Sequence, residues 1–184
     1  MPFALSTVYL VWGATYLALR FMVEEMPALM ANGVRFALAG LLLLAMARRA
    51  GTPMPTPAEW WGAAQVGVFL LVGGVGLVGI AESLGVGSGL AATAVAVMPV
   101  WAGLWGGVFG SWPSAREWAG LALGLVGVVI LTGEGDFQGN LVGTALVIVA
   151  PISWAFGSVW SGRIAMPKGT MSSSAQMLAA APVL

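Results

Sequence analysis

The sequence has no cysteine, no histidine and very little charge. The missing cysteine and histidine exclude disulfides, thiolate nucleophiles, Cys/His metal sites and histidine-based acid–base catalysis, including the Ser–His chemistry of intramembrane proteases. Charged residues make up 8% of the 184 residues, whereas an ordinary soluble domain carries roughly 25%. A soluble fold so poor in charge could not cover its own surface. The composition therefore predicts an integral membrane protein and argues against a soluble enzyme.

Apolar residues make up 59% of the chain and fall in long blocks. A bilayer core about 30 Å thick needs about 20 apolar residues in a helix. Six blocks come close to that length and are predicted to cross the membrane: residues 3–23, 29–47, 61–81, 89–109, 118–132 and 141–160. A seventh block, from about Ala175 to Leu184, is too short to cross, so we expect the sequence to belong to a longer protein. The predicted fold class is all-α, a polytopic bundle of transmembrane helices.

The loops between the predicted spans alternate in charge. Basic residues follow spans 2, 4 and 6, and acidic residues follow spans 1, 3 and 5. Because cytoplasmic loops carry an excess of Lys and Arg, the basic loops and the N-terminus are predicted to be cytoplasmic. Span 1 lacks a basic leader and a cleavage site, so it is predicted to remain as a span of a multi-pass inner membrane protein. The loop charges are Arg48, Arg49, Arg116, Arg163 and Lys168 on one side, and Glu24, Glu25, Glu82, Glu134 and Asp136 on the other.

Span 6 resembles span 1 in its sequence. Trp12-Gly13-Ala14 opens the second half of span 1, and Trp154-Ala155-Phe156-Gly157 does the same in span 6. Each copy is followed by a loop that contains a proline, Pro27 or Pro167. Five spans separate the copies, so the second copy must insert upside down. Inverted repeats of this kind are typical of transporters, with the substrate site between the repeats.

Several short segments have an order and spacing that are more specific than any one of them alone. They are WGATY at 12–16, RF at 35–36, AE at 81–82, SGLAA at 88–92, MPVW at 98–101, PS at 113–114, EWAG at 117–120 and GLVGV at 124–128. Together they resemble the EamA domain of the drug/metabolite transporter superfamily. The resemblance implies ten spans in two EamA repeats and the export or exchange of small metabolites or drugs. Residues 1–135 would be the first repeat and residues 136–184 the start of the second.

Four residues of span 1 share one helical face. Tyr9, Trp12, Tyr16 and Arg20 recur at spacings of three, four and four residues. As a cavity wall, this face would offer Trp12 and Tyr16 to an apolar or cationic ligand. Alternatively, the same face packs against neighbouring helices, with Tyr9 and Arg20 near the two membrane surfaces.

Arg35 lies about 9 Å inside the outer end of span 2, counted from Leu29 at 1.5 Å per residue. A membrane-embedded arginine costs at least about 2.5–3.5 kcal/mol, so it is expected to face a cavity or an anion. We predict that Arg35 and Asn32, one turn away, bind the anionic group of a substrate, with Glu82 as a charge partner and Trp154 as a further contact. Two alternatives remain open, because Arg35 can also extend outward to solvent or form a structural ion pair with a glutamate at the outer ends of the spans.

The segment Gly74-Val75-Gly76-Leu77-Val78-Gly79 matches the dinucleotide-binding pattern GxGxxG. That motif needs a strand before it and an acidic residue about 20 positions later. Here it lies inside an apolar span, and the following span has no charge. We therefore interpret these glycines as sites of close helix packing. Pro99 and Pro151 also lie within spans and are predicted to kink them.

The sequence thus predicts a transmembrane transporter, a secondary efflux or exchange protein for small organic metabolites or drugs. It predicts no catalytic residues, no metal ligands and no cofactor. The expected partners are a small-molecule substrate, the lipid bilayer and either a missing second repeat or a second copy of the chain, with no nucleic acid. The alternative is a membrane assembly or binding subunit without transport, or a half-transporter that acts as a dimer.

Overall fold

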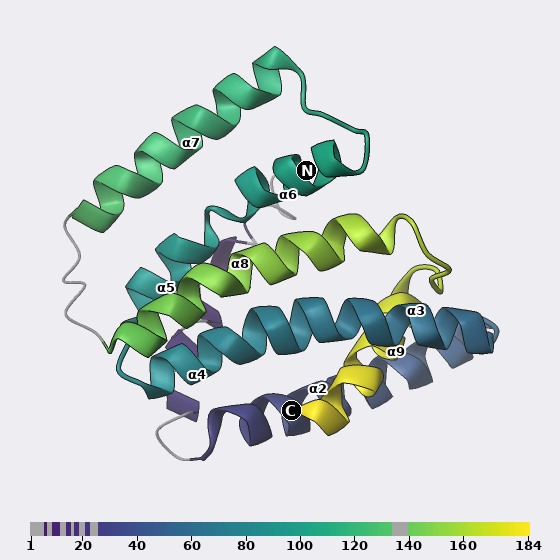
Figure 1. The fold of residues 1–184 in the computed structure, drawn as a ribbon. Helices are drawn as coiled ribbons and strands as arrows, with labels where there is room; N and C mark the ends of the chain where they lie inside the picture. The colour runs from purple at the N-terminus through teal and green to yellow at the C-terminus, as the bar shows by residue number, and fades with distance from the viewer. Residues whose placement is uncertain are drawn as a thin grey trace.

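The computed structural model describes residues 26–133 and 140–184, together with helical residues 6, 9–11, 14, 15, 17, 18, 21 and 22. The side chains of residues 131–133 are not described. Trp12, Tyr16 and Arg20 of predicted span 1, and Glu24 and Glu25 after it, lie outside the described residues. Every regular element of the described residues is helical, which confirms the all-α fold class (Figure 1).

Four helical segments are long and apolar enough to cross a membrane: Ala28–Arg49, Pro57–Ser83, Ser88–Val108 and Leu141–Ser161. They coincide with predicted spans 2, 3, 4 and 6. A further helix of 19 residues covers predicted span 5. The elements are α2 (Ala28–Arg49), α3 (Pro57–Gly67), η1 (Val68–Gly76), α4 (Leu77–Ser83), α5 (Ser88–Val95), α6 (Met98–Val108), α7 (Ala115–Gly133), α8 (Leu141–Ser161), α9 (Thr170–Ala180) and η2 (Ala181–Val183). The prediction of six full spans stays open.

Span 3 begins four residues earlier than its hydropathy indicates, because of a capping box at Thr56. The Thr56 hydroxyl accepts a hydrogen bond from the Glu59 N–H, and the Glu59 carboxylate accepts one from the Thr56 N–H at 2.7 Å. Pro57 occupies the first turn, where its missing N–H costs nothing. Ser114 and Glu117 form the same arrangement at the start of α7.

Spans 3 and 4 are both irregular near their middles. Span 3 contains the π-helix η1 between α3 and α4. Span 4 is interrupted at Ala96 and Val97, and Pro99 lies in the first turn of the new helix, α6. Pro99 was predicted to kink span 4, and the structure places it where the helix ends and restarts. Pro151 lies inside α8, which continues through it as a single element.

Helix α8 is the centre of the bundle. It packs against η1 and α4 on one side and against α5 and α6 on the other (Figure 1). Helix α7 packs on α5 and α6, and Figure 1 shows it at the edge of the molecule. Buried apolar residues of α4, α5 and α8, including Val78, Ala91 and Ala150, form the main core cluster.

Helix α9 packs along α2 in the opposite direction. Gly40 of α2 contacts Met177 and Leu178, whereas Gly33, nearer the start of α2, contacts Ala181 and Leu184. The Ser174 hydroxyl donates a hydrogen bond of 2.8 Å to the Gly40 carbonyl in this interface. The two helices therefore run antiparallel, as the predicted inverted repeat requires.

Helix α9 begins at Thr170, five residues before the predicted start at Ala175. Its start stands 142 residues after the start of α2 at Ala28 (170 minus 28), and the same spacing separates Trp12 from Trp154. Asn32 and Ser174, also 142 residues apart, are both completely buried. The inverted repeat and its boundary at residue 135 stay predictions.

Candidate functional site

Asn32 is a polar side chain buried at the contact between spans 2 and 3. Its Nδ2 donates to the Ala28 carbonyl at 3.0 Å, and a Cβ added at Gly79 of α4 would lie 3.0 Å from the same nitrogen. Its Oδ1 is buried and has no hydrogen-bond partner among the residues that the structure describes. A buried amide oxygen left unpaired costs about 1–3 kcal/mol. Asn32 therefore has an acceptor available for a ligand or a conformational change at this interface.

Glu82 is also buried, with 6% of its surface exposed. It lies three residues after Gly79, which meets α2, and four residues after Val78, which belongs to the core cluster with α5 and α8, so helical spacing places Glu82 between these two faces of α4. This burial excludes the view that Glu82 is an ordinary solvated loop acid. A carboxylate and an amide thus lie within about one helical turn of each other on facing helices.

Arg35 is half-buried on α2, three residues beyond Asn32. Its guanidinium carbon lies 4.7 Å from the centroid of the Phe36 ring, and Phe36 is itself buried. Arg35 and Glu82 lie on opposite sides of the Asn32–Gly79 contact, because α2 and α4 run in opposite directions. At 1.5 Å per residue, their Cα atoms are separated by about 9 Å along the helix axes. The two side chains would have to bridge this distance to form an ion pair.

Trp154 lies on the other side of span 3. A Cβ added at Gly74 would lie 3.0 Å from the Trp154 ring, whereas Gly76 and Gly79 face α2 and the end of the chain. The structure therefore places Asn32 at the contact with Gly79, with Arg35 and the buried Glu82 each about one helical turn from that contact, and it places Trp154 at a different interface. The same contacts confirm that the glycines of the GxGxxG segment serve close helix packing.

Five aromatic residues of spans 3, 4 and 6 form a connected cluster, which we call the inner aromatic cluster. Phe156 is at its centre, with ring centroids 4.6 Å from Phe69 and 5.1 Å from Trp105. Phe156 also stacks on Trp160 at 6.0 Å, and the Trp160 ring lies 5.9 Å from that of Phe109. Trp105 and Phe109, and likewise Phe156 and Trp160, are four residues apart in the sequence. Sequence analysis still missed this cluster, because helical spacing does not show which aromatic faces of different helices meet.

Three polar contacts attach α8 to the irregular spans 3 and 4. The Ser153 hydroxyl donates to the Phe69 carbonyl of η1 at 2.9 Å. The Trp105 indole donates to the Ile152 carbonyl at 3.2 Å, beside Pro151. Nearer the basic loops, the Trp160 indole donates to Gln65 Oε1 at 3.2 Å. These bonds fix α8 against the π-helix of span 3 and against the second half of span 4.

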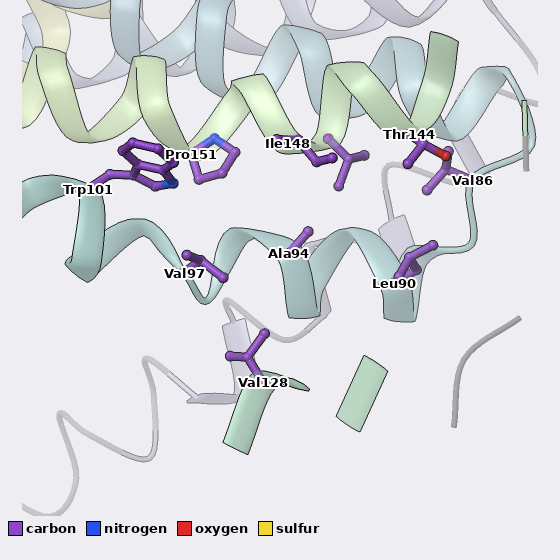
Figure 2. A pocket seen from close by; sticks show the side chains of 10 residues that line it. Val86, Leu90, Ala94, Val97, Trp101, Val128, Thr144, Ile148 and Pro151 are labelled. Carbon is purple, nitrogen blue, oxygen red and sulfur yellow. The ribbon is translucent and has the colours of Figure 1, made fainter. Parts of the chain in front are cut away.

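A cavity of about 270 Å³ lies between α8 and the two helices of span 4 (Figure 2). Helix α8 contributes Pro151 and Thr144 to it, α6 contributes Trp101, and α7 contributes Val128. Among the residues that the structure describes, no charged side chain lines it, and its polar groups are the Thr144 hydroxyl and the Trp101 indole. The lining residues are Val86, Leu90, Ala94, Val97, Trp101, Val128, Thr144, Val147, Ile148 and Pro151.

Residues 2–133 match the sequence profile of the EamA-like transporter family. This chain belongs to the EamA-like transporter family. The match covers elements α2 to α7 and ends at Gly133, so α8 and α9 lie beyond it. The membership agrees with the predicted resemblance and, with the four membrane-length helices, identifies a multi-pass membrane protein.

Two relatives place the chain within the EamA-like transporters. It is 42% identical over 181 residues to a protein of Escherichia coli strain K12 named the uncharacterized inner membrane transporter YedA, covering 98% of this chain and 59% of that protein. It is 25% identical over 161 residues to the probable amino-acid metabolite efflux pump of Salmonella typhimurium, covering 85% of this chain and 52% of that protein. The chain thus spans between half and two thirds of the length of these relatives. No solved structure shows significant similarity to it.

Proposed function

We propose that the chain acts in a secondary transporter of the cell membrane that moves small organic molecules by efflux or exchange. The observation that carries this proposal is the burial of Asn32 and Glu82 at a helix interface of a chain that belongs to the EamA-like transporter family. Buried polar and ionisable groups within membrane spans are expensive and mark substrate or ion pathways. The names of the relatives, an inner membrane transporter and a probable efflux pump, support the same function.

For the substrate, we propose a small molecule with an anionic group. Arg35 would hold this group, because the planar guanidinium can donate two parallel hydrogen bonds to a carboxylate. Asn32 would donate or accept beside it, and Trp12 and Tyr16 would contact the apolar body of the substrate. Glu82, about one turn to the other side of Asn32, would balance the charge while the site is empty.

Trp154 would act differently from its repeat counterpart Trp12. Its packing on Gly74 argues that it supports the far side of span 3 and touches substrate only after a rearrangement. We also propose that the basic loops and the N-terminus are cytoplasmic, on the positive-inside rule. The remaining wall of the site would come from a second repeat or from a second copy of the chain.

Transport by the full-length protein in proteoliposomes tests this function. A panel of radiolabelled amino acids is offered in counterflow, and each active compound is compared between the parent, Arg35→Gln and Arg35→Lys. We expect Arg35→Gln to lower flux at least about tenfold, the loss expected when a charge-assisted bond worth about 1.5–3 kcal/mol is removed. Arg35→Lys should retain part of the flux, because it keeps the charge but not the two-point contact.

Arg49→Gln is the matched control, since Arg49 is exposed at the end of α2. It should transport as the parent does. If Arg35→Gln also transports like the parent, Arg35 is not the anchor. If instead it fails to insert or fold, the structural ion-pair interpretation holds. A parent protein that moves none of the panel would contradict the proposed substrate class.

A further inference from the structure

The cavity between span 4 and span 6 is not part of the proposed substrate site. Along α8 its lining residues are Thr144, Val147, Ile148 and Pro151, which form one stripe at helical spacing. Leu90, Ala94, Val97 and Trp101 form the facing stripe on α5 and α6. In Figure 2 these two rows of side chains point toward each other across one elongated space.

The lining of this space runs from one end of α8 to about its middle. Helix α8 has 21 residues and so spans about 30 Å, the thickness of the bilayer core. Thr144 lies in its first turn and Pro151 halfway along it. Leu90 is likewise in the first turn of α5, and Trp101 lies just past the middle of span 4. Both helices begin at the acidic loops, so the lining of the cavity extends from the acidic-loop end of these helices to about their middle.

The lining chemistry selects against anything charged. Eight of the ten lining residues carry purely aliphatic side chains, and the others are Thr144 near the acidic-loop end and Trp101 at the deep end. A carboxylate placed here would lose its hydration and find no cationic partner among the described lining residues, which is strongly unfavourable. The anionic substrate proposed for Arg35 therefore does not fit. An apolar cavity of this kind also does not hold water well.

We propose that this cavity binds one acyl chain of a membrane phospholipid from the leaflet at the acidic loops. The depth supports this occupant, because one leaflet contributes about 15 Å of hydrocarbon, half of the bilayer core. The stripe from Thr144 to Pro151 covers about 10 Å of that depth at 1.5 Å per residue. The headgroup would remain at the surface near Val86, and the chain would lie between span 4 and span 6 with its end against Trp101. The acyl chain would then fill a space that these helices leave between them.

Fluorescence quenching tests the proposal on the full-length protein in nanodiscs. The nanodiscs contain phosphatidylcholine brominated near the middle of its acyl chains, diluted in unbrominated lipid. The Trp101 signal is isolated by subtracting the emission of a Trp101→Phe variant. We expect the bromines to quench Trp101 at a small fraction of brominated lipid. The variant Ala94→Phe, which fills the cavity, should roughly halve that quenching, because a bound chain needs most of a pocket's volume.

Ala45→Phe is the matched control, since Ala45 is exposed on α2. It should leave the quenching of Trp101 unchanged. Ala94→Leu, a milder substitution, carries the test if Ala94→Phe does not elute as a folded protein. Equal quenching in the parent and in the cavity-filling variants would overturn the proposal, because Trp101 would then contact only bulk lipid.

Discussion

Arg163 joins the ends of span 4 and span 6 through Phe109. Its guanidinium carbon lies 4.5 Å from the centroid of the Phe109 ring, and one of its nitrogens donates to the Phe109 carbonyl at 3.1 Å. Another nitrogen donates to the Val159 carbonyl at 3.3 Å. Phe109 directly follows α6, where carbonyl groups lack helical partners and favour a cation. At the basic-loop side, the inner aromatic cluster thus ends at the guanidinium of Arg163, and we call the contacts of Arg163 with Phe109 and Val159 the Arg163 clasp.

Arg163→Gln should weaken this clasp. We expect a loss of about 1 kcal/mol in stability, the usual value of an exposed cation–π contact together with a helix-end charge. Thermal unfolding of the full-length protein in detergent measures it. Arg163→Lys should recover part of the loss, and Arg49→Gln, at the exposed end of α2, should have almost no effect. An unchanged transition in Arg163→Gln would mean that the clasp contributes nothing to stability.

Gly79→Ala should destabilise the interface between spans 2 and 3. Its Cβ would lie 3.0 Å from Asn32 Nδ2, so the buried amide must move, at an expected cost of about 1–3 kcal/mol. Gly120→Ala is the control, because a Cβ there meets nothing within 4 Å. The double variant Gly79→Ala with Asn32→Ala should be less destabilised than the two single effects predict. Strict additivity would show that Asn32 and Gly79 do not interact.

The Ser114–Glu117 capping box should be visible in a pH titration. The Ser114 hydroxyl and then its backbone N–H lower the pKa of Glu117, which lies just before predicted span 5. A lowered pKa in the folded state means that the cap contributes stability above the ordinary carboxyl pKa. That stability is lost as the pH falls through the lowered value. NMR of the labelled Glu117 carboxyl should show its pKa rise in Ser114→Ala, and an unchanged pKa would contradict the cap.

Cysteine labelling should establish the orientation, because the native chain contains no cysteine. A single cysteine near Arg48 or Arg116 should react with an impermeant reagent only after the membrane is opened. One placed near Glu25 or Asp136 should react in intact cells. The opposite pattern would overturn both the positive-inside assignment and the inverted orientation of the second copy.

Hydropathy predicted spans 2, 3, 4 and 6 because each presents about 20 apolar residues, which only a membrane helix can accommodate. It missed the start of α9, since Ser172, Ser173 and Ser174 read as a polar loop. In the fold, Ser174 is completely buried and bonded to Gly40. Pro99 predicted an irregularity in span 4, whereas no residue of span 3 predicted its π-helix.

The candidate site was only partly predictable. Asn32 and Arg35 were recognisable as polar residues in an apolar block, and the structure adds that Asn32 meets span 3 at Gly79. The burial of Glu82 depends on helices distant in sequence, so position alone suggested a loop. The similar motifs around Trp12 and Trp154 suggested the same role for both residues. In the fold, Trp154 packs on the opposite side of span 3 from Asn32. Helical spacing specifies which side chains share a face, but only tertiary packing specifies which face each neighbour covers.

The π-helix η1 changes the angular phase of span 3. In a regular helix each residue turns the chain by about 100°. One extra residue in a wide turn therefore rotates the directions of all later side chains about the helix axis. Before η1, Gly62 and Gly67 face α9 and the loop that leads to it, and beyond η1, Gly79 faces α2. Removing one residue between Val68 and Gly76 would shorten the wide turn and rotate Gly79 away from α2. The length of this segment, more than its composition, therefore determines which partner the outer half of span 3 meets.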